Sequence, residues 1–364
     1  VGVQTASTIN PNPGVHSRLT GVGSLFLGAH MMHEDALSPE FKYFGSDVFS
    51  NVYDGEKKIE MPKSLQILGF SDDKDPGVPK AHENYVFRRE VLRDLLGFLR
   101  KPNHDALFIT GPTGSGKTSA VLETCARLNW PVQSLTLSSR FEFAQLAGHF
   151  TFAAAAVGEA PQMRFQYGPL AVAMKYGHVL VLNEVDLADA GELAGLNDIL
   201  EGRALVLAEN AGEIVVPHPM FRVICTANSC GSGDNSGRYV GVQQQNLAFM
   251  DRFRFLEVPY QDAKVEEELL TQLAPAMKPV LGGMVQLANE VRKLFTEGRL
   301  SVTLSTRTLV RWVQIAQDFR NSPNSLEYGL QRALLMRAEP EESQAIVGLC
   351  RTVFGDAWSS VTEK

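Results

Sequence analysis

Residues 106–128 read ALFITGPTGSGKTSAVLETCARL, and this stretch decides the fold. The apolar run at 106–110 predicts a buried strand, which a glycine-rich loop joins to a helix-forming segment. Residues 111–118 match GxxxxGKT, in which glycines let backbone amides curl around phosphates at the amino end of a helix. Lys117 brings positive charge to the terminal phosphates, and the Thr118 hydroxyl can ligate Mg²⁺. The stretch therefore predicts ATP or GTP binding by Gly111, Pro112, Thr113, Gly114, Ser115, Gly116, Lys117, Thr118 and Ser119.

A second apolar run, VLVLNEVDL at 179–187, ends in polar residues as the second nucleotide strand of P-loop ATPases does. Its carboxyl end is expected beside the phosphate loop, where ligands bind in open α/β sheets. Glu184 is then placed to orient the attacking water. Asn183 stands where such strands usually carry Asp, and its carbonyl oxygen brings no negative charge to a metal. We expect Mg²⁺ to be held weakly at Thr118 and Asn183, with Asp186 as an alternative source of charge.

Apolar runs continue to alternate with longer helical or loop stretches, which predicts an α/β fold with a doubly wound parallel sheet. After residue 258 the strands disappear and amphipathic helices follow, so residues 259–262 are the best domain boundary. Residues 1–80 show no persistent helical or strand period. The expected strands are 106–110, 134–138, 178–183, 221–227 and 254–258, and the expected helices are 85–101, 262–274, 278–297, 305–319, 325–337 and 341–354.

The composition bounds the class of protein. The chain has 364 residues, 44% of them hydrophobic, and a formal net charge of -7, so it can bury a sizeable core and gives no sign of a broad phosphate-binding surface. The net charge still allows a local basic channel in an oligomer. No apolar run approaches a membrane span, and the first residues lack the pattern of a signal peptide.

The cysteines and histidines do not predict a metal site. Four scattered cysteines, Cys125, Cys225, Cys230 and Cys350, form no disulfide-like framework, which favours a reducing compartment, the cytoplasm. Cys225 lies in an apolar strand and Cys230 in a glycine-serine loop, so a zinc pair is not expected. The motif HMMHE, residues 30–34, has no identifiable third ligand.

Residues 84–311 resemble the AAA+ ATPases of the MoxR group, and within it the CobS-like family, the ATPase subunits of cobaltochelatase. The segment ARLNWPVQSLTLSS, 126–139, resembles the part that follows the phosphate loop in that family. An aromatic-glycine-proline-leucine exit at 167–170 is similar to the end of the helix-2 insert. The segments ALVLAENAGEIVVPHPMFRVICTANS, GRYVGVQQQNLAFMDRF and STRTLVRW resemble the pre-sensor hairpin with its sensor 1 strand, the arginine-finger region and the start of the sensor 2 helix.

The resemblance implies a fold, an activity and further site residues. It implies an AAA+ core with a five-stranded parallel sheet and a helical lid, and Mg²⁺-dependent ATP hydrolysis. Asn228 would be the sensor 1 residue, Arg252 the arginine finger that reaches the neighbouring subunit, with Arg254 as its competitor, and Arg307 the sensor 2 arginine of the lid. The implied parts are a region 1–80 of unknown role, a core 81–260 with an insert at about 149–168 and a pre-sensor hairpin at about 203–217, and a lid 261–364.

Three functions follow as alternatives. The first is a ring, a hexamer in this family, that remodels a protein partner; the resemblance implies a partner with a von Willebrand factor A domain or a metal-chelatase-like complex. The second is a nucleic-acid motor or loader on the same core. Residues 150–170 contain Arg164 as their single basic residue and Glu159 as an opposing charge, which argues against a pore that tracks phosphates. The third is a nucleotide-binding switch, in which Asn183 has ended useful turnover.

Overall fold

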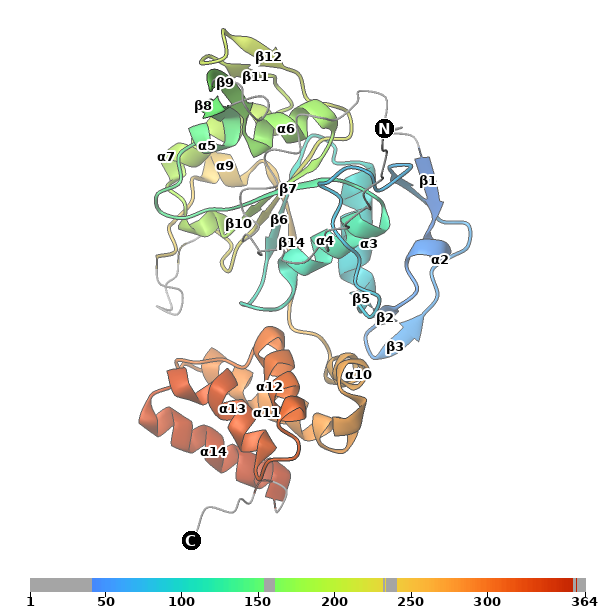
Figure 1. The fold of residues 1–364 in the computed structure, drawn as a ribbon, viewed down its shortest axis with the longest axis vertical. Helices are drawn as coiled ribbons and strands as arrows, with labels where there is room; N and C mark the ends of the chain where they lie inside the picture. The colour runs from blue at the N-terminus through green and yellow to red at the C-terminus, as the bar shows by residue number, and fades with distance from the viewer. Residues whose placement is uncertain (1–40, 154–160, 232, 234–240, 356–357, 359–364) are drawn as a thin grey trace, which may run out of the picture.

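The computed structural model describes residues 41–153, 161–231, 233, 241–355 and 358. At its centre lies a five-stranded sheet with strand order β14-β6-β13-β10-β7, and all its neighbouring strands are parallel (Figure 1). This confirms the predicted parallel sheet. The strands are β6 (Ala106–Thr110), β7 (Val132–Thr136), β10 (Val179–Asn183), β13 (Arg222–Thr226) and β14 (Phe253–Glu257).

Helices cover both faces of this sheet. Leu107 and Ile109 of β6 pack with α3 (Arg89–Arg100) and α4 (Lys117–Arg127) in one apolar cluster. Phe108, which points to the opposite face, packs with α6 (Pro169–Tyr176) in a second cluster. Each such side chain contributes about 1.5–3 kcal/mol on full burial. The doubly wound arrangement follows, because parallel strands that are buried on both faces need helices on both sides.

Three predicted segments had boundaries that were wrong by two or more residues. The helix expected at 325–337 ends at Ala333 and is followed by a separate 3-10 helix. The other two segments belong to the core. The helix expected at 85–101 begins only at Arg89, because residues 87–88 form the short strand β5 (Phe87–Arg88), which pairs in parallel with β2 (Val52–Asp54). The strand expected at 134–138 is β7, which begins and ends two residues earlier. In both cases pairing with a distant segment sets the boundary, and local periodicity does not report such pairing.

The region before the core holds short strands that the sequence did not reveal. Strand β1 pairs antiparallel with β4, while β2 pairs with β3 and β5. Phe49 and Phe70 are almost fully buried here and join the core cluster of α3 and α4. The remaining elements of this region are β1 (Phe41–Phe44), α2 (Gly45–Val48), β3 (Lys57–Ile59) and β4 (Gln66–Gly69). The histidines of the HMMHE motif lie outside the described residues.

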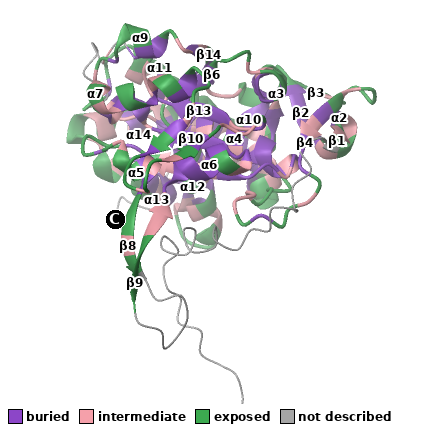
Figure 2. Cartoon of the chain, turned by 90° about the horizontal axis from the view of Figure 1, so that it is seen from above, coloured by how far each residue is buried: buried purple, intermediate pink, exposed green. Residues whose placement is uncertain are grey.

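Two hairpins extend from the core. Strands β8 (Gly148–Ala153) and β9 (Gln162–Tyr167) pair antiparallel and project as an exposed ribbon (Figure 2), and residues 154–160 between them lie outside the described residues. Strands β11 (Leu205–Leu207) and β12 (Glu213–Val215) pair in the same way. Short helices complete the core: α5 (Ala144–Ala147), η2 (Val185–Leu187), α7 (Ala190–Leu193), η3 (Ala194–Leu196), α8 (Asn197–Leu200) and α9 (Leu247–Met250).

After the sheet, the described chain is helical and builds its own apolar cluster, in which Trp312 is fully buried. The buried ion pair of Arg292 with Glu266 lies within this part. Among the helices of the described ranges, none has the length and apolarity that a membrane crossing requires. The elements are α10 (Ala263–Leu273), η4 (Pro275–Met277), α11 (Lys278–Thr296), α12 (Thr306–Asp318), α13 (Ser325–Ala333), η5 (Leu335–Arg337) and α14 (Pro340–Phe354).

Candidate functional site

The glycine-rich loop joins β6 to α4 at the carboxyl edge of the sheet, where α4 begins at Lys117. Gly111 has φ +144, and a Cβ there would lie 2.2 Å from the Val258 carbonyl oxygen. Gly114 has φ +71, and a Cβ there would lie 2.6 Å from Ser305 Oγ. Only glycine combines these backbone angles with such close approaches. The loop is therefore packed against the chain after β14 and against the start of α12.

Lys117 lies inside this loop. Its Nζ donates to the carbonyl oxygen of Gly111 at 2.7 Å, to that of Pro112 at 3.1 Å and to Asn228 Oδ1 at 2.9 Å. Burial lowers the pKa of Lys117 to about 8, while the charges of Glu184 and Asp186 act in the opposite direction. Close to it the Ser115 hydroxyl is buried without a hydrogen-bond partner. An ammonium group held by neutral oxygens beside an unsatisfied hydroxyl fits an incoming phosphate group.

Asn183 ends β10 beside the first turn of α4. Its Oδ1 accepts from the Thr118 hydroxyl at 2.7 Å and from the Thr226 hydroxyl at 3.1 Å. Its Nδ2 donates to Ser134 Oγ at 3.0 Å, which fixes the amide with its oxygen toward Thr118. A hydroxyl and an amide oxygen are ligands that suit a hard cation such as Mg²⁺. Ser119, the last residue expected at the loop, is exposed on α4.

Glu184 follows Asn183 in a left-handed conformation, with φ 54 and ψ 43, which turns the chain sharply at the end of the strand. Non-glycine residues in this region are uncommon and cluster at functional sites. Its Oε2 accepts from Asn228 Nδ2 at 2.7 Å. Burial, followed by the nearby Asp186 charge, raises the pKa of Glu184, whereas Lys117 and the Asn228 bond lower it. Asn228 thus joins the lysine of the loop to the carboxylate.

Asp186, which the sequence offers as an alternative source of charge for the metal, contacts the loop that follows β13. It is fully buried, and its Oδ2 accepts from the backbone N–H of Asn228 at 3.0 Å and from that of Ser229 at 3.1 Å. The Ser229 hydroxyl also donates to this oxygen, at 3.2 Å. Asp186 therefore fixes the loop that carries Asn228. The described residues hold no group of three His, Cys, Asp or Glu side chains suited to a metal.

Residues from outside the loop also reach it. Tyr260 donates from its hydroxyl to the Thr113 carbonyl oxygen at 2.9 Å, and Arg88 donates from Nη2 to the Ser115 carbonyl oxygen at 3.3 Å and from Nη1 to the Pro259 carbonyl oxygen. Sequence reasoning missed both residues, because nothing local marks them. Arg307 is the second residue of α12, and a Cβ added at Gly114 would lie 3.5 Å from the Arg307 Cβ. The Arg307 charge lowers the pKa of both Lys117 and Glu184.

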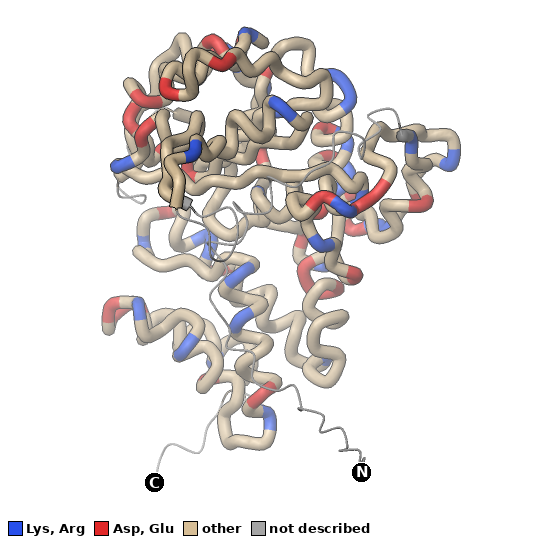
Figure 3. The backbone as a smooth tube through the Cα atoms, turned by 45° about the horizontal axis from the view of Figure 1, so that its top comes forward, with Lys and Arg blue, Asp and Glu red and all other residues tan. Residues whose placement is uncertain are grey.

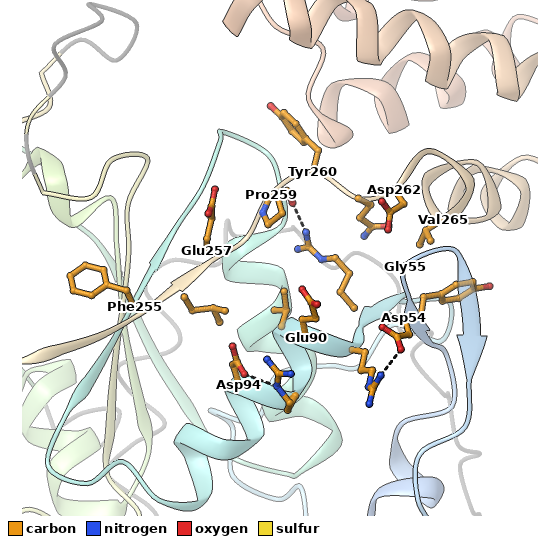
Figure 4. A pocket seen from close by; sticks show the side chains of 17 residues that line it. Asp54, Gly55, Glu90, Asp94, Phe255, Glu257, Pro259, Tyr260, Asp262 and Val265 are labelled. Carbon is orange, nitrogen blue, oxygen red and sulfur yellow. Dashed lines mark hydrogen bonds and ion pairs between the residues drawn. The ribbon is translucent and has the colours of Figure 1, made fainter.

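A pocket lies between the start of α3, the strand β2 and the linker from β14 to α10 (Figure 4). Arg88 and Arg89 both line the pocket; Arg89 forms an ion pair with Asp54, and Arg88 donates to the Pro259 carbonyl oxygen. Because Arg88 also bonds to the glycine-rich loop, this pocket and the loop share one wall.

The two candidate finger arginines lie at the opposite edge of the sheet. Strand β14 pairs in parallel with β6, so that Phe253 is opposite Ala106 and Glu257 is opposite Thr110. Arg252 precedes β14, forms an ion pair with Glu201 and donates to the Ala248 carbonyl oxygen. Arg254 donates to the Pro102 carbonyl oxygen at 3.1 Å and pairs with Asp105 at 3.2 Å. The structure thus brings together the predicted loop, Asn183, Glu184, Asn228 and Arg307, and leaves these two arginines away from them.

Comparisons with known proteins cover most of this architecture. The family described as an AAA domain of the dynein-related subfamily matches residues 106–253, and the CbbQ/NirQ/NorQ C-terminal family matches residues 266–353. The aerobic cobaltochelatase subunit CobS of Sinorhizobium sp is 31% identical over 257 residues, 67% of this chain and 74% of that protein. An uncharacterized protein of Staphylococcus saprophyticus is 27% identical over 75% of this chain and 100% of its own length. The structure of a Thermotoga maritima RuvB mutant covers 77% of this chain and 75% of its own, with TM-score 0.44 and 12% identity.

Proposed function

The chain belongs to the AAA+ ATPases of the MoxR and CobS type, and on that premise we propose that it hydrolyses ATP in a Mg²⁺-dependent reaction and uses the cycle to remodel a protein partner. The observation that carries the proposal is the single cluster that joins Lys117, Glu184 and Asn228 at the glycine-rich loop. Phosphoryl transfer to water requires a lysine that binds the phosphates and a carboxylate that orients the water, and an amide between them can contact both.

Each residue has a separate task in this proposal. The loop amides and Lys117 bind and orient the phosphates, and Thr118 with Asn183 would hold Mg²⁺. When bound, Mg²⁺ neutralises part of the charge on the phosphate oxygens. Glu184 orients the attacking water and accepts its proton, and burial, which raises its pKa, favours this role. Asn228 keeps this carboxylate directed at the phosphate, and Arg307 adds charge from the lid.

The experiment that tests the proposal is Mg²⁺-dependent ATP turnover by the purified chain, with Glu184→Gln as the background. Turnover well above this background supports hydrolysis. Turnover equal to the background, with ATP still bound, would favour the nucleotide-binding switch instead. The complete set of Glu184, Asn228 and two candidate arginines favours hydrolysis, because a switch has no need of a water-orienting carboxylate.

Replacing Asn183 by Asp should strengthen Mg²⁺ binding. A carboxylate adds one negative charge at the metal side, and Ser134, which accepts from the amide, can donate to a carboxylate instead. At a contact distance of a few ångströms this charge is expected to lower the Mg²⁺ concentration for half-maximal ATP binding by about tenfold. A titration of ATP binding with Mg²⁺ measures the shift, and Asn246→Asp, at an exposed helix cap, is the matched control. An unchanged Mg²⁺ midpoint would remove Asn183 from the metal site.

The place of Arg252 supports assembly into a ring, which we propose to be a hexamer. In the described structure Arg252 lies at the amino ends of the strands, away from its own glycine-rich loop, so it can serve a nucleotide only in a neighbouring subunit. The family implies a protein partner, and a protein with a von Willebrand factor A domain is the candidate. The free cysteines support a reducing compartment, and we propose the cytoplasm.

The hairpin of β8 and β9 favours a protein partner over nucleic acid. Phe152 is 72% exposed and Met163 59% exposed, and the two face each other across the hairpin on the same side as Phe150. An exposed apolar face of this kind marks a protein contact. Along the described part of the chain, Lys and Arg positions alternate with Asp and Glu positions on the face that Figure 3 shows. A second apolar pair, Val206 and Ile214, is exposed on the β11–β12 hairpin.

Single-stranded DNA should therefore leave ATP turnover unchanged. Tracking of a phosphate backbone needs a basic groove and yields binding that weakens steeply with salt. The measurement is turnover with increasing single-stranded DNA at low and at high salt. Strong stimulation that disappears at high salt would support the motor or loader in place of the protein remodeller.

A further inference from the structure

Tyr260 contacts both the glycine-rich loop and the helical region. It lies on the linker between β14 and α10 (Figure 4). Its hydroxyl donates to the Thr113 carbonyl oxygen at 2.9 Å, while the Arg292 guanidinium of α11 lies 4.1 Å from the centre of its ring. A hydrogen bond at one end and a cation–π contact at the other tie the two parts together through one side chain.

Arg292 extends this connection to the start of α12. It is almost fully buried and forms a two-pronged pair with the Glu266 carboxylate, in which both N–O distances are 2.8 Å. Its Nε donates to the Leu304 carbonyl oxygen at 2.8 Å, and Glu266 Oε1 also accepts from the Thr306 hydroxyl at 2.6 Å. The bidentate geometry fixes the guanidinium plane, so the ring of Tyr260 and the backbone next to Arg307 keep a defined relation.

The hydrogen bond to Thr113 also affects the amides of the loop. In a trans peptide the carbonyl and the N–H point in opposite directions. Because the Tyr260 hydroxyl holds the Thr113 carbonyl oxygen, the N–H of Gly114 points away from Tyr260, on the other side of that peptide. Arg88 acts in the same way on the peptide between Ser115 and Gly116. It holds the Ser115 carbonyl oxygen and so fixes the direction of the Gly116 N–H. Amides fixed before phosphate arrives bind it without a cost of reorganisation.

We propose that Tyr260 is a positioning residue that orients the amide of Gly114 for phosphate and, through Arg292, Glu266 and Thr306, couples that orientation to the position of Arg307. The inference rests on the proposed function, because it deepens the role of the same nucleotide site. Tyr260 touches no reacting atom in this scheme. Its effect reaches the phosphates through the loop backbone on one side and through the lid arginine on the other.

The test is Tyr260→Phe, which removes the hydroxyl and keeps the ring under Arg292. The loss of one positioning hydrogen bond is expected to weaken ATP binding about three- to tenfold and to raise KM in the same proportion, with kcat reduced less. The melting temperature should stay that of the wild type, because the ring and its packing are retained. Tyr328→Phe is the matched control, since Tyr328 carries an arginine, Arg332, over its ring in the same helical region.

Coupling to the lid is measured by combining Tyr260→Phe with Arg307→Ala. If Tyr260 acts partly through Arg307, the effect of Tyr260→Phe on ATP binding becomes at least twofold smaller in the Arg307→Ala background. Binding of a fluorescent ATP analogue gives this result independently of turnover. If the wild-type chain binds the analogue and the Tyr260→Phe and Tyr328→Phe variants bind it with the same affinity, the inference is overturned and the proposed function stands. A wild-type chain that binds no nucleotide would overturn both.

Discussion

Replacement of Glu184 by Gln is expected to lower ATP turnover by about 10²- to 10⁴-fold, the range that a general base supplies. The side chain keeps its size and can still pair with Asn228, whose Nδ2 lies 2.7 Å from the carboxylate. It can no longer accept a proton from water. Lys117 and the loop amides are untouched, so the affinity for ATP should stay within about twofold of the wild type.

The measurement is steady-state phosphate release together with ATP binding at equilibrium. Glu209→Gln, at an exposed position of the same core, is the matched control and should turn over ATP as the wild type does. If Glu184→Gln lost binding as well as turnover, the carboxylate would hold the structure of the site and would not be the base. If turnover persisted, another group would have to orient the water, and the assignment of Glu184 would fail.

The core of the fold was readable because its signals are local. Strands β6 and β10 are buried at every position, and such strands appear in sequence as continuous apolar runs. The glycine-rich loop was readable for a similar reason, since its glycines meet a backbone requirement within eight residues. The helices after the sheet were also found to within a few residues, because each buries one stripe of side chains.

The parts that could not be predicted depend on contacts between distant segments. Tyr260 and Thr113 are 147 positions apart, and Arg88 and Ser115 are 27 apart, so no local pattern reports either bond. The strands before the core, such as β2 with three residues, are too short to show a period. From the sequence, Asp186 is a candidate source of charge for the metal because Asn183 brings none. Its actual contacts are backbone amides 42 and 43 residues away.

Replacement of Arg252 by Ala is expected to lower turnover by about 10³-fold or more, the contribution of an arginine supplied to a phosphoryl-transfer site in trans. Arg252 precedes the residue opposite Ala106, while the glycine-rich loop follows Thr110. With a rise of about 3.3 Å per residue, this places Arg252 more than about 13 Å from its own loop. ATP binding by the variant should therefore be unchanged. Arg254→Ala is the comparison, and a larger loss there would transfer the role to Arg254.

Mixing two inactive variants distinguishes a role in the neighbouring subunit from a structural one. The Lys117→Ala variant loses phosphate binding by the lysine but keeps Arg252, whereas the Arg252→Ala variant keeps an intact glycine-rich loop. When the two are mixed in equal amounts, about a quarter of the interfaces join an intact loop to an intact arginine, so about a quarter of wild-type turnover should return. A structural defect at Arg252, such as loss of its pair with Glu201, would stay within its own subunit, and mixing would then restore nothing. Recovery in the mixture would show at once that Arg252 acts on a neighbour and that the ATPase site is complete only in an assembly.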